Sequence, residues 1–399
     1  MHGLDGTEVE VVVAGGGPAG VATALHLARR GHEVLVLDRA TFPREKVCGE
    51  GLMPHGVEEL HGLGLLDVVR ATGAQPFGGI AYHIDGVRAF GRFPPREPQR
   101  DGLGVRRLRI DAAMHEACAA EPGIALRTGV KVRDFEVDPA GVTVQTTQGA
   151  VRGRVLVGAD GLRSPIRRRL GLQRPDTSPP RYGVRGHFRL QEPPPAEVRV
   201  YAADGVEFYV TPTGPRELNV ALLCGREVTR DLGGDLAAGF HRLVHDFEPV
   251  AALLHDAEPA SDPALIGPLR QRVGGAVADR AVLVGDAAGF VDAITGEGMS
   301  LALVSSRLAA ETLDAALRED RLDADRLRAY GRAYRKVARD ATWLTELILW
   351  GLRRRALARR VVRNLARHPD LFGQVLAVNT GQSPIASLGA GGLARLLVG

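Results

Sequence analysis

The strongest constraint on the fold is a glycine-rich turn near the N-terminus, placed between a strand pattern and a helix pattern. Residues 8–14 form a valine-rich run typical of a buried parallel strand, and the glycine-rich residues 15–20 follow at once. Residues 21–30 have a helical pattern, and residues 33–37 form a second apolar run that leads into Asp38. The order strand, Gly-x-Gly-x-x-Gly, helix, strand and acid predicts a Rossmann-like α/β fold that binds a dinucleotide.

The three glycines of the motif have different physical tasks. Gly15 permits the tight turn, Gly17 lets the backbone approach a pyrophosphate, and Gly20 lets the helix pack closely on the strand. The N-terminus of the helix offers free N–H groups and a partial positive charge to the phosphates. Asp38 follows at the spacing expected of an acid that accepts hydrogen bonds from the adenosine ribose. The motif alone does not separate FAD from NAD, because both contain the same ADP moiety.

Two later segments place a carboxylate directly after a strand pattern. Residues 155–158 lead into Asp160 and an Asp-Gly turn, and residues 281–284 lead into a Gly-Asp pair that contains Asp286. The carboxyl ends of parallel strands form the ligand-binding edge of an open α/β sheet. Asp286 can accept hydrogen bonds there from the hydroxyls of a ribityl chain, which favours a flavin.

Together these segments resemble the FAD-dependent oxidoreductases of the p-hydroxybenzoate hydroxylase type, a family that includes aromatic hydroxylases, halogenases and geranylgeranyl reductases. The resemblance covers residues 8–320. It implies a discontinuous FAD-binding domain, an inserted β-rich substrate domain whose sheet faces the flavin, and a C-terminal helical region. The predicted bounds are 1–78, 101–176 and 270–320 for the FAD-binding domain, 79–100 and 177–269 for the substrate domain, and 321–399 for the C-terminal helices.

The resemblance also assigns residues to the cofactor. Arg107 matches the family's arginine that approaches the flavin side of FAD, and Val130 matches a strand residue near the adenine. The glycine-rich residues 289–300 lead into an apolar helical run whose positive N-terminus would stabilise an anionic reduced flavin. The cofactor-binding candidates are Gly15, Gly17, Ala19, Gly20, Asp38, Arg39, Lys46, Cys48, Gly49, Arg107, Val130, Asp160, Asp286, Gly296, Gly298 and Met299.

Two segments supply the candidates that would act beside the flavin. Residues 46–54, Lys-Val-Cys-Gly-Glu-Gly-Leu-Met-Pro, are similar to the Lys-x-Cys-Gly-Gly segment of the geranylgeranyl reductase branch and contain Cys48 and Glu50. Residues 208–214 resemble the strand that faces the flavin, with Tyr209 where reductases and halogenases have tryptophan. A lone cysteine is more often a small buried residue than a reactive one. The redox chemistry itself belongs to the flavin.

The segment after Asp286 bears on the branch of the family. Hydroxylases of this type usually read Gly-Asp-Ala-Ala-His, then Pro and Gly-Gln-Gly, whereas this chain has Gly289, Ala293 and Glu297 at those places. Its Thr-Gly-Glu-Gly at residues 295–298, together with Cys48, favours the reductase branch. The altered aromatic strand and the breadth of hydroxylases in the family favour a monooxygenase.

We expect an FAD-dependent monooxygenase that hydroxylates or epoxidises an apolar or aromatic small molecule with NADH or NADPH and O2. The alternative is a geranylgeranyl reductase-like enzyme that reduces carbon–carbon double bonds, and a flavin-binding protein without turnover would leave the substrate-domain strands unexplained. Flavin halogenases need a lysine early in the chain, and none lies between Lys46 and Lys131, which argues against a halogenase. No second Gly-x-Gly-x-x-Gly follows a strand, so the nicotinamide donor is expected to bind only transiently.

Composition disfavours several other classes. The 399 residues are 45% hydrophobic and 25% charged, which is typical of a globular protein of two or three domains. Three dispersed cysteines and twelve scattered histidines predict neither a disulfide framework nor a metal site. The net charge of +4 comes without a nucleic-acid module, so no nucleic-acid partner is expected. We expect a cytoplasmic protein, because no signal-peptide pattern and no spanning apolar run of ~18 residues is found.

The C-terminal region combines an apolar segment with a cationic one. Residues 343–352 are apolar and contain Trp343 and Trp350, and seven arginines follow up to residue 367. The more usual interpretation is a helix that packs its apolar face on the FAD-binding domain and leaves the arginines in solvent. The alternative is peripheral contact of residues 343–367 with a membrane that carries anionic lipids.

Overall fold

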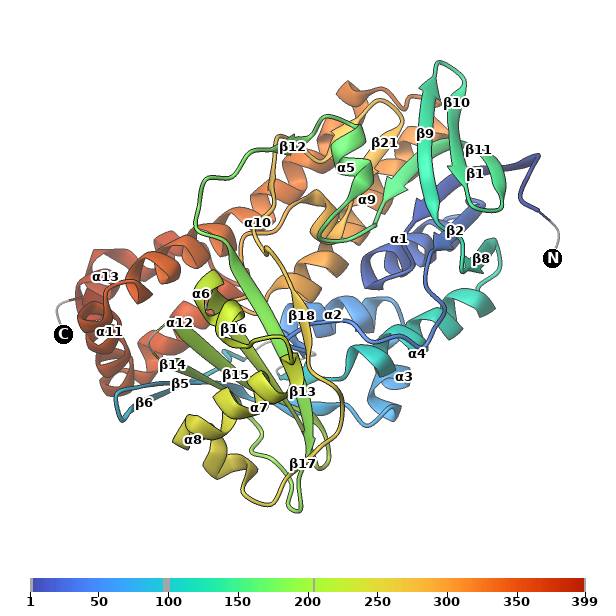
Figure 1. Cartoon of the computed structure of the whole chain (residues 1–399). Helices are drawn as coiled ribbons and strands as arrows, with labels where there is room; N and C mark the ends of the chain where they lie inside the picture. The colour runs from blue at the N-terminus through green and yellow to red at the C-terminus, as the bar shows by residue number, and fades with distance from the viewer. Residues whose placement is uncertain (1–2, 96–100, 204, 398–399) are drawn as a thin grey trace.

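The computed structural model describes residues 3–95, 101–203 and 205–397. Two large β-sheets occupy the upper right and lower left of Figure 1, with helices packed around them and a helical C-terminal region at the left. This arrangement confirms the expected α/β class with a C-terminal helical region. The numerical domain bounds stay a prediction.

The first sheet is built from the segments around the glycine motif. Its strand order is β20-β21-β11-β1-β2-β8, and the pairs from β21 to β8 are parallel. Its strands are β1 (Thr7–Ala14), β2 (Val34–Asp38), β8 (Ile124–Thr128), β11 (Gly149–Gly158), β20 (Val277–Ala278) and β21 (Ala281–Leu283), with a hairpin of β9 (Val132–Asp138) and β10 (Gly141–Thr146) attached to β11. Because these pairs are parallel, the glycine motif, Asp38, Asp160 and Asp286 all lie at one edge of the sheet.

The helix after the glycine motif begins three residues earlier than the sequence pattern predicted. Helix α1 spans Pro18–Ala28, and Pro18 is favourable in the first turn because its missing N–H would have no partner there. Buried side chains of α1 pack against α9 (Gly298–Arg318) and α4 (Arg107–Ala120), which share a core with the sheet. The neighbouring helices are α2 (Pro54–Gly62), α3 (Leu66–Ala71) and α5 (Pro165–Arg169).

The second sheet has the order β17-β13-β16-β15-β14-β5-β6, with β18 also paired to β13. Its strands are β5 (Gly79–Ile84), β6 (Val87–Arg92), β13 (Arg181–Arg189), β14 (Val198–Ala203), β15 (Val206–Gly214), β16 (Glu217–Gly225), β17 (Glu258–Pro259) and β18 (Ala264–Ile266). Short pairings join β3 (Gly51–Leu52), β7 (Gly102–Gly104) and β4 (Gln75–Phe77), and also β12 (Gln173–Arg174) and β19 (Arg272–Val273).

Side-chain alternation gives the second sheet two different faces. Phe208, Val220 and Leu222 form a core with α7 (Leu236–Asp246) and α8 (Glu248–Ala251), which cover one face. The alternate residues, such as Tyr209 and Leu223, point to the other face and join a separate apolar cluster. The remaining elements near this sheet are α6 (Arg226–Asp231) and the 3₁₀ turn η1 (Ala252–Leu254).

The C-terminal helices extend from one sheet to the other. They are α10 (Ala324–Leu352), α11 (Arg355–Arg367), α12 (Pro369–Asn379), η3 (Ile385–Leu388) and α13 (Gly389–Leu397). Leu327 and Tyr330 of α10 belong to the core of the first sheet. However, Leu344 and Leu349, near the end of α10, belong to the apolar cluster of the second sheet, and α11 and α12 pack on its edge strand β6.

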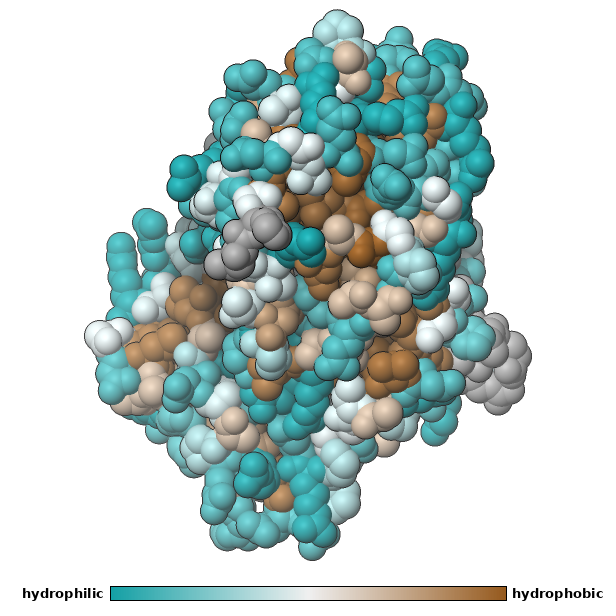
Figure 2. Space-filling view, turned by 90° about the vertical axis from the view of Figure 1, so that its right-hand side faces the viewer, coloured by the Kyte–Doolittle hydropathy of each residue, from teal (hydrophilic) through white to brown (hydrophobic). Residues whose placement is uncertain are grey.

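The surface shown in Figure 2 is mainly hydrophilic, with apolar side chains visible in a recess in its upper half. None of the helices in the described part of the chain has the length and apolarity to cross a membrane.

Candidate functional site

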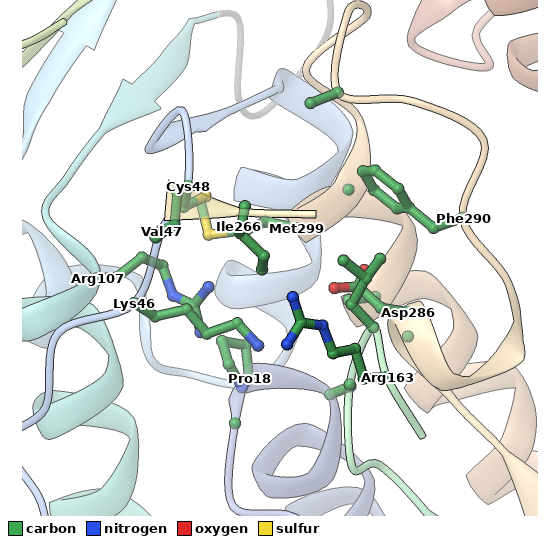
Figure 3. A pocket seen from close by; sticks show the side chains of 18 of the residues that line it. Pro18, Lys46, Val47, Cys48, Arg107, Arg163, Ile266, Asp286, Phe290 and Met299 are labelled. Atoms are coloured by element: carbon green, nitrogen blue, oxygen red, sulfur yellow. The ribbon is translucent and has the colours of Figure 1, made fainter. Parts of the chain in front are cut away.

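A cavity of about 800 Å³ is lined by the carboxyl edge of the first sheet and by the second sheet. Figure 3 shows Lys46, Cys48, Arg107, Arg163 and Asp286 around its centre. All the cofactor-binding candidates from the sequence line this cavity except Gly20, and Glu50 and Tyr209 line it too. The volume is within the range of about 300–1,000 Å³ that ligand sites occupy.

The turn formed by residues 15–20, here called the glycine cradle, contains two glycines that backbone packing requires and one that leaves space for a ligand. A Cβ atom on Gly15, whose φ is +115°, would lie 2.2 Å from the Ala159 carbonyl oxygen, and one on Gly20 would lie 1.8 Å from the Gly15 carbonyl oxygen. A Cβ atom on Gly17 would meet only Arg44 Nη2, at 3.6 Å. Gly15 and Gly20 are therefore required by backbone packing, whereas Gly17 keeps space open at the N-terminus of α1.

Asp38 lies at the end of β2, beside the glycine cradle. Its carboxylate accepts hydrogen bonds from the backbone N–H of Gly16 at 2.7 Å and of Ala40 at 2.8 Å. The adjacent cavity wall contains Arg39 and Val130. These contacts fix the carboxylate where a ribose hydroxyl can reach it.

The two other strand-end aspartates differ in their surroundings. Asp160 Oδ2 accepts a hydrogen bond from the Ile166 N–H at 3.1 Å, while Oδ1 is buried and has no partner among the described residues. Burial raises the pKa of the Asp160 carboxyl. Asp286 lies in the 3₁₀ turn η2 (Gly285–Ala288) and lines the cavity, as Figure 3 shows. An unpartnered buried oxygen facing a ligand cavity is what a hydroxyl-rich ligand would satisfy.

Three functional groups gather where the segment 46–50 meets α4. Arg107 donates two hydrogen bonds to Asp111, at 2.7 and 2.8 Å, and is held beside Cys48. Burial, reinforced by the charge of Arg107, lowers the pKa of the Lys46 ammonium. Burial raises the pKa of the Cys48 thiol, although Arg107 and the Glu50 N–H, 3.3 Å from Sγ, act in the opposite direction. Cys48 is thus a thiol with its proton in place at neutral pH.

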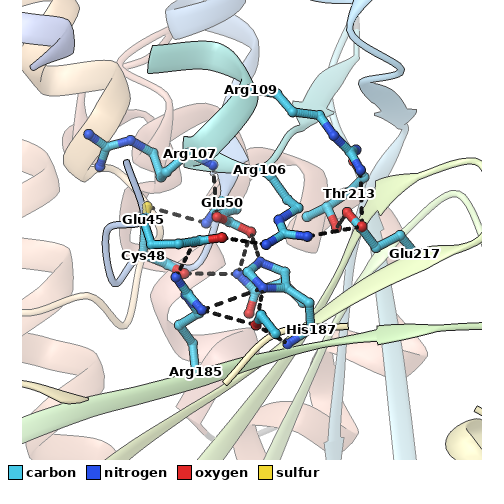
Figure 4. Close-up of polar contacts among 12 residues, drawn as sticks. Glu45, Cys48, Glu50, Arg106, Arg107, Arg109, Arg185, His187, Thr213 and Glu217 are labelled. Carbon is cyan, nitrogen blue, oxygen red and sulfur yellow. Dashed lines mark hydrogen bonds and ion pairs between the residues drawn. The ribbon is translucent and has the colours of Figure 1, made fainter. Parts of the chain in front are cut away.

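Glu50 is not a free carboxylate, although the sequence suggested it as a group beside the flavin. Its side chain is fully buried, and Oε1 accepts a hydrogen bond from the Arg107 N–H at 2.8 Å. Its Oε2 accepts one from Asn219 Nδ2 at 2.9 Å and lies 2.6 Å from His187 Nε2. Figure 4 shows the contacts of Glu50 with Arg107 and His187. Through His187 and Asn219, the segment 46–50 is joined to strands β13 and β16. Glu50 therefore positions Cys48 rather than offering a base to a ligand.

The network continues outward through residues that sequence reasoning missed. His187 Nδ1 lies 2.7 Å from Ser261 Oγ, and Arg109 pairs with Glu217 at 3.0 Å. Glu45 pairs with both Arg185 and Arg106. No local motif announces His187 or Asn219, because their partner Glu50 is more than 130 positions away in the chain.

We expect His187→Ala to lower the free energy of unfolding by about 3–5 kcal/mol, because it removes one partner of a fully buried carboxylate. Denaturant unfolding of the flavin-loaded protein measures this change. The matched control is His245→Ala on the exposed face of α7, which should change stability by less than about 0.5 kcal/mol. Equal stability of the two variants would contradict the role given to the Glu50 network.

Tyr209 also has a positioning role. Its hydroxyl donates a hydrogen bond to the Ile294 carbonyl oxygen at 3.0 Å, and burial raises the pKa of its phenol well above the ordinary value. Arg181 makes a second connection between the sheet and this loop, because it forms ion pairs with Glu207 of β15 at 2.6 Å and with Asp292 at 2.9 Å. The second sheet thus holds the loop that leads to Gly296, Gly298 and Met299.

The cavity wall from the second sheet is mainly apolar, with Arg185, Thr211, Tyr82 and Tyr209 as its polar side chains. Its lining side chains include Ile80, Val198, Val200, Ala221, Leu223, Leu265 and Ile266. Burial raises the pKa of Tyr82 to about 12, so this phenol stays neutral. The nucleotide side, in contrast, contains the arginines Arg44, Arg163, Arg168 and Arg169, which the sequence did not single out. A cavity with one cationic end and one apolar end suits FAD beside an apolar substrate.

Comparison with known proteins agrees with this geometry. The profile of the FAD binding domain family matches residues 8–345. Menaquinone reductase from Mycobacterium tuberculosis is 32% identical over 370 residues, which cover 84% of this chain and 84% of the relative. Digeranylgeranylglycerophospholipid reductase 2 from Methanopyrus kandleri is 30% identical over 339 residues, which cover 81% of each chain.

Solved structures share the fold. A flavoprotein/dehydrogenase from Cytophaga hutchinsonii superimposes with a TM-score of 0.85 at 19% identity, covering 98% of this chain and 97% of that one. A probable FAD-dependent monooxygenase from Pseudomonas aeruginosa gives a TM-score of 0.73 at 24% identity, covering 88% of this chain and 98% of that one.

Proposed function

This chain belongs to the FAD binding domain family of flavin-dependent oxidoreductases, and on that premise we propose that it reduces carbon–carbon double bonds in a long isoprenoid chain. NADH or NADPH is the proposed electron donor, bound transiently. This proposal takes up the geranylgeranyl reductase-like alternative from the sequence analysis and adds a substrate class to it. It replaces the monooxygenase that the sequence analysis favoured.

The observation that carries the proposal is the chemistry of the cavity wall. Among the second-sheet residues that line the cavity there is no carboxylate and no histidine, within the described part of the chain. Hydroxylation of a phenol gains from a positioned general base, whereas an aliphatic chain needs only apolar contact. The pKa values of Tyr82 and Tyr209 are raised by burial, so neither phenol serves as a base.

The relatives support the same substrate class. Both reductases described above are named for molecules that carry isoprenoid chains, and each is at least 30% identical over most of its length. The monooxygenase neighbour is below 25% identity and supports the fold alone. The Thr-Gly-Glu-Gly segment and Cys48 point in the same direction.

The protein's own groups supply what this reduction needs besides electrons. The overall change adds one hydride equivalent and one proton across the double bond, while NAD(P)H becomes NAD(P)+. Bound FAD supplies two-electron chemistry between the nicotinamide and the substrate. Cys48 Sγ holds a proton in the cavity, because burial keeps its pKa raised. Arg107 places positive charge beside it.

Monooxygenation is the second candidate, because Tyr209 stands where reductases of the resembling branch have tryptophan. Anaerobic turnover separates the two reactions. The full-length protein, NADPH or NADH, and menaquinone with an unsaturated isoprenoid chain are incubated without O2, and the products are weighed by mass spectrometry. After any quinol has been oxidised back to the quinone, we expect a product whose isoprenoid chain is heavier by two hydrogens, because reduction of the quinone ring alone adds the same mass and is reversed by that oxidation. Product formed only in air, with label from isotopically heavy O2, would establish the monooxygenase instead.

A further inference from the structure

Helix α10 exposes an apolar stripe near its C-terminal end. Trp343 is 54% exposed, Leu347 is 37% exposed and Trp350 is 48% exposed. Spacings of four and three residues place the three side chains on one face of the helix, over about 10 Å. We call these three residues the Trp stripe. Large aromatic side chains at such exposure call for an explanation in a chain that has only two tryptophans.

Core packing does not explain the Trp stripe. Ala341, Leu344, Thr345 and Leu349 occupy the other side of the same helix and are buried. Leu344 and Leu349 complete the apolar cluster that contains Val200, Tyr209 and Ile294. The apolar contacts that α10 makes with the protein are therefore satisfied without the two tryptophans, which face outward.

The charge around the stripe is strongly polarised. Residues 332–367 contain eleven arginines and lysines and two acids, which gives +9 in this segment, whereas the whole chain carries +4. The rest of the chain is therefore net negative, at −5. Arg354 lies 4.2 Å from the centroid of the Trp350 ring, so cation and aromatic group are already side by side. Arg360, Arg363 and Arg367 are exposed on α11 and have no acidic partner within ion-pair distance among the described residues.

We propose that the Trp stripe and the arginines that follow it dock on the surface of a bilayer that contains anionic lipid. Tryptophan rings favour the boundary between headgroups and acyl chains, and clustered arginines attract anionic headgroups. An interfacial helix needs an apolar face of this kind beside a cationic one, and it does not cross the bilayer. A nucleic acid would bind the arginines but would gain little from contact with Leu347. A second copy of this chain that used the same surface would place two segments of charge +9 against each other.

Docking in this orientation brings the bilayer close to the cavity. The inner side of α10 carries Thr345, whose hydroxyl oxygen lies 3.2 Å from that of Thr295, a residue that lines the cavity. One helix diameter, about 10–12 Å, thus separates the Trp stripe from the cavity wall. The use of this proximity to deliver substrate rests on the proposed isoprenoid substrate, whereas the docking itself does not.

Intrinsic fluorescence tests the docking, because Trp343 and Trp350 are the only tryptophans of the chain. The flavin-loaded protein is titrated at low ionic strength with vesicles of phosphatidylcholine, with or without phosphatidylglycerol. We expect a blue shift and co-sedimentation with the anionic vesicles only, quenching by lipids brominated on the acyl chain, and at least tenfold weaker binding in high salt. Absence of a shift and of co-sedimentation at low salt would overturn the proposal. A shift caused instead by duplex DNA, or by raising the protein concentration without vesicles, would also overturn it.

Variants assign the effect to this surface. Trp343→Ser with Leu347→Ser, and separately Arg353→Glu with Arg354→Glu, should each weaken vesicle binding at least tenfold. The charge-matched control is Arg127→Glu with Arg216→Glu, at exposed positions on β8 and in the turn between β15 and β16, which should retain binding within about twofold. Equal weakening by the control would show that net charge alone attracts the vesicles. Flavin content and anaerobic turnover of detergent-dispersed substrate should remain in all three variants, so failure of docking is distinguishable from failure of the proposed reaction.

Discussion

Gly17→Val is expected to give a folded protein that purifies without flavin. The wild type should be yellow with about one FAD per chain, and the variant should retain less than about a tenth of that content, because the added side chain fills the space that Gly17 leaves at the N-terminus of α1. The backbone of Gly17, with φ −73° and ψ 179°, is extended and accepts valine without strain. The loss of a glycine N-cap costs on the order of 1 kcal/mol or less of stability.

Two further glycines make the result specific. Gly20→Val should lower stability itself, because its Cβ would lie 1.8 Å from a backbone oxygen. Gly62→Ala, at the end of α2, meets no atom within 4 Å and should keep its flavin. Flavin absorbance and circular dichroism of the three purified variants provide the comparison. A yellow Gly17→Val protein with full flavin content would show that the cofactor does not approach the backbone here.

Cys48→Ala is expected to reduce the rate of double-bond reduction about 10²-fold or more, since it removes the group that holds a proton in the cavity. Reduction of the bound flavin by NAD(P)H should change by less than about twofold, because that step does not use the thiol. The matched control is Cys224→Ala on β16, which removes a buried thiol that does not line the cavity. Equal turnover by Cys48→Ala and wild type would remove Cys48 from the reaction.

The pH profile provides a second readout for Cys48. A proton donor is lost as the pH rises through its pKa, and burial places the Cys48 pKa above its ordinary value. Wild-type turnover should therefore show no loss attributable to this thiol between about pH 6 and pH 8. A decline centred below about pH 8 that disappears in Cys48→Ser would show that the thiol ionises too easily for this role.

The nucleotide side of the fold was predictable because its signals are local. The strand, the glycine turn, the helix and Asp38 lie within 31 positions of one another, and each position has a distinct steric or electrostatic task. The position of Asp160 and Asp286 was predictable because each follows the carboxyl end of a strand, and in a parallel sheet all carboxyl ends lie at the same edge. The family resemblance assigned Arg107 and Val130 to the cofactor, and both line the cavity.

The positioning contacts were not predictable, because they join distant segments. The sequence suggested Glu50 and Tyr209 as groups beside the flavin, and both line the cavity. It did not indicate that Glu50 contacts His187 and Asn219, or that the Tyr209 hydroxyl donates a hydrogen bond to the Ile294 carbonyl oxygen. No periodicity encodes such pairs. The packing of α11 and α12 on β6 was missed for the same reason, since an amphipathic helix shows that it has a partner but not which one.

Reoxidation of the reduced protein without oxygen tests the central claim most directly. The flavin-loaded enzyme is reduced by light under anaerobic conditions and mixed with menaquinone or with a saturated-chain analogue of the same quinone, and flavin absorbance and side-chain mass are followed together. The reductase account predicts that absorbance returns at a rate that depends on the unsaturated chain, with one double bond reduced per flavin oxidised. A flavin that stays reduced until O2 is admitted, with the chain unchanged, would contradict it.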